Sequence, residues 1–265
     1  MTIKNINPFE KHSGAAAIAS PRGLILLVVM VSFFAVLLAK LEIIGVGLLL
    51  VIFFGSIYVY LLFKNPIVGF YTAIGLNFVI LGLGRYIQGL PLGFAIDGIM
   101  ILTFIALIFS RFKERINWSP ANKEITILAG IWLLYFIFQL VNPEARMIEP
   151  WIAGRGIGFY FFFFIVLTLM LIDTNKKLDT FLYVWGVFSI IATLKGMMQL
   201  YLGVDSAEQA WLNAGGAETH ILFGKLRVFS FFSDAGQFGA NQGFSGVVAI
   251  IYSMTKKGFP KIFFL

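Results

Sequence analysis

Long apolar segments with very few charges are the feature that most constrains the fold of this chain. Of its residues, 59% are hydrophobic and only 12% are charged, whereas an ordinary soluble domain has about 25% charged residues. A helix needs roughly 17 to 25 residues to cross a bilayer. About eight apolar segments approach or reach that length: 24–39, 43–63, 67–84, 93–110, 125–141, 153–172, 180–201 and 236–254. The sequence therefore predicts an all-α, polytopic bundle of transmembrane helices.

The N-terminal residues 1–23 are basic and precede a short apolar segment, which is also the pattern of a signal peptide. No small-residue cleavage site follows this segment, and the second apolar segment begins after only Lys40-Leu-Glu42. We therefore expect a cytoplasmic N-terminal tail followed by a transmembrane hairpin.

The C-terminal end of the chain has the start of a ninth apolar segment. This segment begins at Phe259, and the chain stops at Leu265, which is too short for a membrane crossing. We expect residues 24–265 to be the N-terminal portion of a longer transmembrane domain, incomplete at its C-terminus.

The net charge of +7 is explained by membrane topology and needs no nucleic-acid partner. Basic residues concentrate in the cytoplasmic loops of membrane proteins. With a cytoplasmic N-terminus, most of the 20 Lys and Arg residues fall on that side. The exceptions are Lys40, Arg85, Arg146, Arg155, Lys195, Lys225 and Arg227.

Four of these exceptions lie near the outer ends of the predicted helices. Arg85 ends the third helix and Arg155 begins the sixth, while Lys195 lies near the outer end of the seventh and Arg227 precedes the eighth. Interfacial cations on this side indicate a functional site, and the planar guanidinium group can bind two phosphate oxygens at once. The alternative is that they reach toward lipid headgroups.

Three glycines surround Arg155 in Ala153-Gly-Arg-Gly-Ile-Gly158. The N-terminus of a helix presents unpaired N–H groups and a positive dipole end, so an anion could bind there. No strand precedes this cluster, which excludes a dinucleotide fingerprint. Close packing of helices through glycine is the alternative.

The longest outer loop, about residues 202–226, contains several acidic residues, Trp211 and His220. This composition suits a surface near a saccharide or a lipid headgroup. His220 is either a general base or an incidental loop residue. No His, Asp or Glu grouping has metal-ligand spacing and the chain has no cysteine, so we expect no metal and no cofactor.

The run from Lys225 to Gly246 leads from this loop into the eighth apolar segment and is unusually polar and glycine-rich. It carries Arg227, Asp234, Gln237 and Asn241. Such groups are costly in a bilayer unless they are buried in protein or face water. We therefore expect this run to contribute to a site.

This run resembles a helix start of bacterial O-antigen ligases and related exopolysaccharide polymerases, in Arg227-Val-Phe-Ser-Phe-Phe-Ser-Asp followed by Gly-Gln-Phe-Gly-Ala-Asn. Arg155 in Trp-Ile-Ala-Gly-Arg-Gly looks like a second arginine of that family, at the mouth of an earlier helix. Leu62-Phe-Lys-Asn-Pro-Ile-Val-Gly69 and the opening hairpin are similar to the family's N-terminal half, notably in its exopolysaccharide branches. Asp234-Ala-Gly-Gln stands where the family has Asn/Asp-Pro-Asn.

The resemblance implies a fold like that of family-C glycosyltransferases, embedded in the inner membrane of a bacterium. It implies that saccharide is transferred from an undecaprenyl-pyrophosphate carrier to a glycan or lipid acceptor, or is polymerised, at the outer face of that membrane in cell-surface polysaccharide synthesis. The family needs neither a nucleotide sugar nor an essential metal. Because ligases take a catalytic histidine from a later loop, we expect this chain to be inactive alone.

The resemblance also implies roles for particular side chains. Arg227 and Arg155 are expected to be catalytic, holding the pyrophosphate and stabilising the charge that develops on the leaving group. Further substrate-binding residues are expected to be Arg85, Lys195, Asp234, Gln237 and Asn241.

A transporter or flippase of an anionic lipid-linked substrate is the main alternative. Lys195 and Asp97 are ionisable groups inside predicted spans, as transport pathways require. Asp97 could instead form a structural ion pair with one of the arginines. The chain lacks the internal repeat common in transporters.

A rhomboid-like intramembrane protease is a further alternative, because Gly243-Phe-Ser-Gly246 matches the Gly-x-Ser-Gly motif of these enzymes. Their serine pairs with a histidine on a later helix. Here His12 and His220 both precede Ser245, so the motif more simply indicates a helix-packing surface.

The predicted topology can be tested with a reporter fused after residue 215. We expect the fusion to report a periplasmic location, because the loop of residues 202–226 lies on the side poor in basic residues. Paired alkaline phosphatase and fluorescent-protein fusions measure this. A cytoplasmic signal would overturn the orientation.

Overall fold

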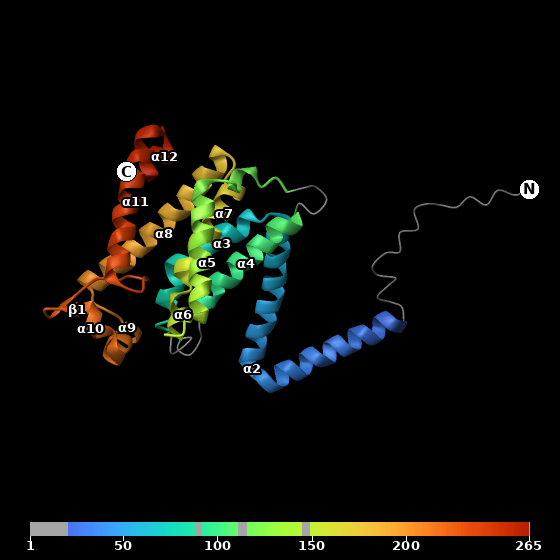
Figure 1. Ribbon diagram of the computed structural model, residues 1–265. Coiled ribbons are helices and arrows are strands. Elements are labelled where there is room, and N and C mark those ends of the chain that lie inside the picture. Colours follow the sequence, from blue (N-terminus) through green and yellow to red (C-terminus); the bar gives the residue numbers. More distant parts are fainter. Residues whose placement is uncertain (1–20, 88–91, 111–115, 145–148, 265) are drawn as a thin grey trace, which may run out of the picture. The chain divides into compact units, whose positions relative to one another are not determined.

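The computed structural model describes residues 21–87, 92–110, 116–144 and 149–264 (Figure 1). Within these ranges the chain is mostly helical, with one small β-hairpin. The chain divides into two compact units, residues 1–60 and 61–265. The predicted site residues all belong to the second unit.

The helices follow the apolar segments expected from the sequence. They are α2 (Pro21–Lys64), α3 (Ile67–Leu83), α4 (Gly93–Ser110), α5 (Glu124–Phe138), α6 (Glu149–Gly154), α7 (Gly156–Leu171), α8 (Asn175–Tyr201), α9 (Ser206–Trp211), α10 (Ala217–His220), α11 (Ala235–Thr255) and α12 (Phe259–Phe263). Strands β1 (Ile221–Leu222) and β2 (Lys225–Leu226) pair antiparallel. Short 3₁₀ turns lie at Ser119–Ala121 and Gln139–Val141, and a π turn at Leu212–Gly216.

Five helical segments in the described ranges are long and apolar enough to cross a membrane: Gly45–Lys64, Gly93–Ser110, Glu124–Val141, Pro150–Leu171 and Asn175–Tyr201. Helix α3 is apolar but shorter, at 17 residues. Helix α11 forms where the eighth span is predicted, but it is not among the five, since polar residues such as Gln237, Asn241 and Gln242 lower its hydropathy. The chain is therefore an all-α membrane protein.

The predicted hairpin at the start of the chain has no loop between its two apolar segments. Residues 40–42, where a turn was expected, are helical, and α2 continues from Pro21 to Lys64. Ala39, Lys40, Leu41 and Glu42 all favour helix, and no glycine or proline interrupts them. The expected interruption of the helix at these charged residues was therefore wrong, although α2 bends sharply near its middle (Figure 1).

Polar residues and proline set the helix boundaries that matter for the site. Pro66, which lacks an N–H group, lies between α2 and α3. Thr174 caps α8 by accepting a hydrogen bond from the Lys177 N–H group at 3.4 Å. Asp234 caps α11 through the Gln237 N–H group at 2.9 Å, the usual role of aspartate at this position.

The core of the second unit is built around α3. Phe70, Ile74 and Phe78 of α3 are buried against Leu171 of α7, Ala192 of α8 and other apolar residues. Helix α3 packs on α4 and α8, α7 packs on α4 and α5, and α11 packs on α8. Since lipid is as apolar as these side chains, close packing rather than exclusion of water stabilises such contacts.

Helices α8 and α11 are also joined by polar contacts along their length. The Trp185 indole N–H group donates to the Ser245 hydroxyl group at 2.8 Å. The Ser189 hydroxyl group donates to the Gln242 side chain at 3.0 Å, and Lys256 pairs with Asp179 at 3.0 Å. Each interhelical hydrogen bond in a membrane contributes about 0.6 kcal/mol on average, so the set fixes the register of this pair.

The contact between α3 and the segment before α11 can be tested at Gly82. A Cβ atom there would lie 2.8 Å from the Cα atom of Phe231, whereas one at Gly98 would meet nothing within 4 Å. We expect Gly82→Ala to destabilise the protein by about 1–3 kcal/mol. The control Gly98→Ala should be neutral or stabilising by up to about 1 kcal/mol. Thermal unfolding in detergent micelles measures both, and equal midpoints would contradict this close approach.

Candidate functional site

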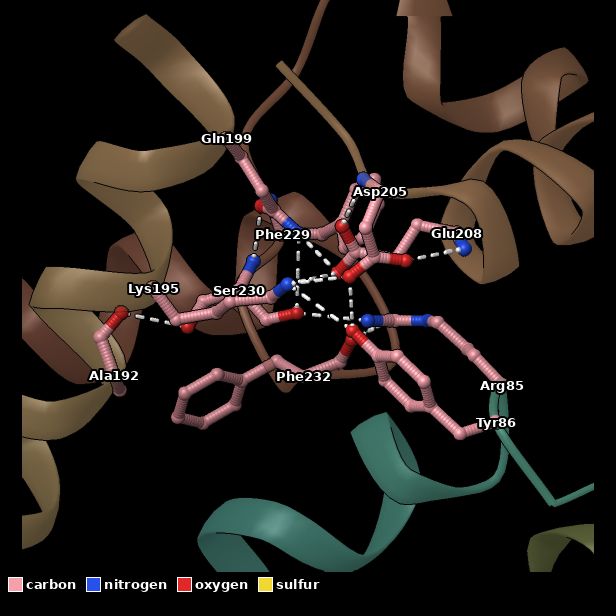
Figure 2. Close-up of polar contacts among 10 residues, drawn as sticks. All are labelled: Arg85, Tyr86, Ala192, Lys195, Gln199, Asp205, Glu208, Phe229, Ser230 and Phe232. Atoms are coloured by element: carbon pink, nitrogen blue, oxygen red, sulfur yellow. Dashed lines mark hydrogen bonds and ion pairs between the residues drawn. The ribbon is translucent and has the colours of Figure 1, made fainter. Parts of the chain in front are cut away.

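The candidate site lies where the C-terminal ends of α3 and α8 meet the α8–α11 connection, which comprises residues 202–234. Figure 2 shows side chains from these three parts converging on a shared polar cluster. Within the connection, Asp205 and Glu208 form a capping box at the start of α9. The Asp205 carboxylate accepts from the Glu208 N–H group at 3.0 Å, and the Glu208 carboxylate accepts from the Asp205 N–H group at 3.3 Å.

Lys195 is the cation at the centre of this cluster. Its ammonium group lies 2.9 Å from the Asp205 carboxylate and 3.1 Å from that of Glu208. It also lies 3.1 Å from the Tyr86 hydroxyl oxygen. The Glu208 residue is fully buried, so Lys195 supplies the positive charge that a buried carboxylate needs.

Arg85 lies beside this ion pair and is 5% exposed. Its guanidinium group donates to the Ser230 carbonyl oxygen at 2.7 Å and to the Phe232 carbonyl oxygen. It also lies over the rings of Trp211 and Phe229, at 4.6 and 4.3 Å from their centroids. These contacts are typical of a structural arginine held by carbonyl groups and aromatic faces.

Gln199 belongs to the same cluster and was missed by the sequence analysis. Its side chain contacts Glu208, Phe229 and Ser230 and is almost completely buried. The sequence does not single out this glutamine as a site residue, because its hydrogen-bond partners lie up to 31 residues away. Its one signal in the sequence is a polar side chain within an apolar helix.

Arg227 is exposed, unlike the other predicted cations. Its backbone N–H group donates to the His220 carbonyl oxygen at 2.8 Å, which extends the β1–β2 hairpin by one bond. Its guanidinium group donates to the Thr219 carbonyl oxygen at 3.2 Å. Most of the donor groups of this guanidinium thus remain accessible.

His220 is buried between the rings of Trp211 and Phe229, with centroids 4.9 and 5.0 Å away. Its Nδ1 atom lies 2.9 Å from the Gly216 carbonyl oxygen. Its Nε2 atom has no hydrogen-bond partner in the described part of the chain. This packing is that of a core histidine of the connection rather than of a general base that faces substrate.

Arg155 forms an ion pair with Asp97. The sequence had left such a structural ion pair open as the alternative role of Asp97. The Arg155 Nε atom lies 2.5 Å from the Asp97 carboxylate, and both side chains are 17% exposed. Arg155 also donates to the Ile152 carbonyl oxygen and lies over the Phe94 ring. Among the described residues it has no hydrogen bond or ion pair with the Lys195 cluster.

The glycines around Arg155 serve helix packing in part. A Cβ atom at Gly158 would lie 3.0 Å from the Phe136 ring of α5. Arg155 itself has helical backbone angles between α6 and α7, so the break between these helices is small. The alternative of glycine-mediated packing therefore accounts for Gly158.

The remaining predicted residues build the start of α11. Asp234 caps this helix, and the Gln237 side chain accepts from the Ser233 hydroxyl group at 2.7 Å. The Nδ2 atom of Asn241 is buried, and no partner for it lies among the described residues. Ser245 accepts a hydrogen bond from Trp185, which is a helix-packing role and gives the protease alternative no support.

Across the ranges that the structure describes, no group of three or more His, Cys, Asp or Glu side chains could hold a metal ion. The carboxylates of Asp205 and Glu208 are instead paired with Lys195.

The geometry defines a class of protein: a polytopic helical membrane protein with a polar cluster at the ends of α3 and α8. The chain matches no protein-family model, and no curated protein or solved structure is significantly similar to it.

The pKa values of the groups outside the membrane-spanning segments reflect this arrangement. Burial lowers the pKa of Arg85, and the nearby Glu208 carboxylate opposes this effect. Burial opposes ionisation of Asp205, but hydrogen bonds from Tyr86, the Glu208 N–H group and Lys195 lower the pKa of Asp205 to about 2. The ionised form of Asp205 is therefore the stable one.

This shift predicts a pH dependence of stability. Because the folded-state pKa of Asp205 lies below its ordinary value of 3.8, ionised Asp205 contributes fully above about pH 4 and loses its contribution as the pH falls toward 2. Asp205→Asn removes that contribution at every pH. The unfolding midpoint of the wild type should therefore exceed that of Asp205→Asn most above about pH 4, and the difference should shrink as the pH falls from about 4 toward 2. Thermal unfolding in an acid-stable detergent measures it, and a difference that is constant with pH would contradict the assignment.

Proposed function

We propose that this chain forms part of a membrane enzyme that transfers or polymerises saccharide from an undecaprenyl-pyrophosphate carrier. The acceptor is a glycan or a lipid, and the reaction takes place at the outer face of a bacterial inner membrane. This is the activity implied by the resemblance to O-antigen ligases and exopolysaccharide polymerases. The reaction needs cationic groups that bind a diphosphate and stabilise the charge of the leaving group.

The observation that carries the proposal is the contrast between Arg227 and the three other predicted site cations, Arg85, Arg155 and Lys195. Arg155 is paired with Asp97, and Lys195 with Asp205 and Glu208. Arg227 is exposed, and within the described part of the chain its guanidinium group has one hydrogen bond, to the Thr219 carbonyl oxygen. A guanidinium with free donor groups can bind two oxygens of a phosphate at once.

The proposal gives different roles to the predicted residues. Arg227 is the residue that contacts the diphosphate of the carrier. Arg85 and Lys195 support the connection on which Arg227 lies, through their contacts with Ser230 and Glu208. Arg155 becomes available to substrate only if its pair with Asp97 opens.

The proposal is tested by replacing Arg227 in the native gene. We expect Arg227→Ala to lower saccharide transfer or polymerisation by about 100-fold or more, as removal of a transition-state charge partner does. Arg227→Lys should also be impaired, because an ammonium group cannot bind two oxygens in a fixed plane. The length and amount of cell-surface polysaccharide are measured, with protein abundance checked by immunoblot.

Lys225→Ala is the matched control, because Lys225 is an exposed cation two residues away on the same hairpin. Cells with the Lys225→Ala variant should make cell-surface polysaccharide of nearly the same length and amount as the wild type. Normal polysaccharide in the Arg227→Ala variant, at normal abundance, would refute the proposed function.

A further inference from the structure

The Gln199 side chain is 2% exposed, although the residues on either side of it in α8 face outward. A primary amide has two donor hydrogens and one oxygen that accepts two hydrogen bonds. A buried amide must form these bonds within the protein, since none can form with water.

The Gln199 amide oxygen accepts from two successive backbone N–H groups, those of Phe229 at 3.2 Å and Ser230 at 2.8 Å. Its amide nitrogen donates to the Glu208 carboxylate at 2.8 Å and to the Ser230 carbonyl oxygen at 3.4 Å. All four possibilities are used, and Figure 2 shows the amide between these partners. One side chain of α8 thus connects α9 with residues 229–230.

The backbone at Ser230 depends on such contacts. Ser230 has a φ angle of 51°, in the left-handed region that non-glycine residues seldom adopt. Three groups hold it there: the Gln199 oxygen at its N–H group, the Arg85 guanidinium at its carbonyl oxygen, and the Ala192 carbonyl oxygen at its hydroxyl group, 2.6 Å away. Two of the three come from α8.

The anchored segment leads directly to Arg227. Arg227 lies two residues before Phe229, and its other attachments are to His220 and Thr219, which belong to the same connection. Of the contacts that join the connection to the helices, the anchor at Phe229 and Ser230 is nearest to Arg227 in the sequence, whereas Asp205 and Glu208 join the connection to Lys195 near its start. We propose that Gln199 is a positioning residue: by holding these two residues against α8 it orients Arg227 without contacting substrate. This inference rests on the proposed function only where it concerns activity.

Cleavage by trypsin tests the positional part independently of any activity. Lys225 and Arg227 are exposed, and cleavage after them requires the hairpin to open. In the purified full-length protein, we expect Gln199→Leu to raise the rate of this cleavage about tenfold or more, because buried partner groups lose their hydrogen bonds. Mass spectrometry of the fragments measures the rate.

Two further variants complete this measurement. Gln209→Leu is the matched control, since the Gln209 side chain is exposed and, among the described residues, is hydrogen-bonded to Asn213 of the neighbouring turn alone. Its cleavage rate should match that of the wild type. Gln199→Asn keeps the amide but is one methylene shorter, so it cannot reach all four partners, and its rate should fall between those of the wild type and Gln199→Leu. This variant also replaces Gln199→Leu if the latter does not accumulate.

Activity then tests the coupling to Arg227. In membranes of the native host, the initial rate of saccharide transfer is measured for Gln199→Leu, Arg227→Lys and the double variant. If Gln199 acts through Arg227, the double variant should be no slower than the slower single variant, whereas a general loss of stability multiplies the two effects. The inference would be overturned if both Gln199 variants were cleaved at the wild-type rate. It would also be overturned if the effects of Gln199→Leu and Arg227→Lys on the transfer rate multiplied in the double variant.

The two proposals fail separately. If Arg227→Ala supports normal polysaccharide synthesis, the proposed function is wrong, and the trypsin measurement still decides whether Gln199 fixes the hairpin. If Arg227→Ala is inactive but the Gln199 variants behave like the wild type in both measurements, only the positioning role is refuted.

Discussion

The buried carboxylate of Glu208 is the constraint on which the polar end of this bundle depends. It is fully buried and is held by the Lys195 ammonium group at 3.1 Å and the Gln199 amide at 2.8 Å. Removing one partner of such a pair costs about 3–5 kcal/mol, because the other charge stays buried and unpaired. Both partners lie on α8, so the connection that carries Glu208 must stay packed against the end of that helix.

In this cluster Lys195 and Arg85, both predicted to bind substrate, contact other protein groups instead. Lys195 and Arg85 lie where the sequence placed them, close to the ends of apolar helices, but in this structure their donor groups are directed at protein partners. Lys195 has two carboxylates within 3.1 Å, and Arg85 has two carbonyl groups and two aromatic rings. They would affect an anion bound at Arg227 by holding the connection in place and by their electrostatic field, and not by direct contact with the anion.

Much of the fold was predictable because the bilayer imposes a length and a hydropathy on each crossing. The limits predicted for α3 and α4 agree with the observed helices within a residue or two. The prediction failed at Lys40-Leu-Glu42, where charge was taken as a turn although all three residues favour helix. Of the candidate site, the positions of Arg85, Arg155 and Lys195 near helix ends followed from the sequence, while the hairpin beside Arg227 and the role of Gln199 did not.

The sequence by itself determined that the chain is an all-α membrane protein and that Arg85, Arg155 and Lys195 lie near helix ends, because hydropathy and charge are local properties. Tertiary structure alone decided which of these cations is paired. Arg155 meets Asp97 from 58 residues away, and Arg85 meets Ser230 from 145 residues away. Such partners depend on the directions in which packed helices present their side chains, and no local pattern encodes that.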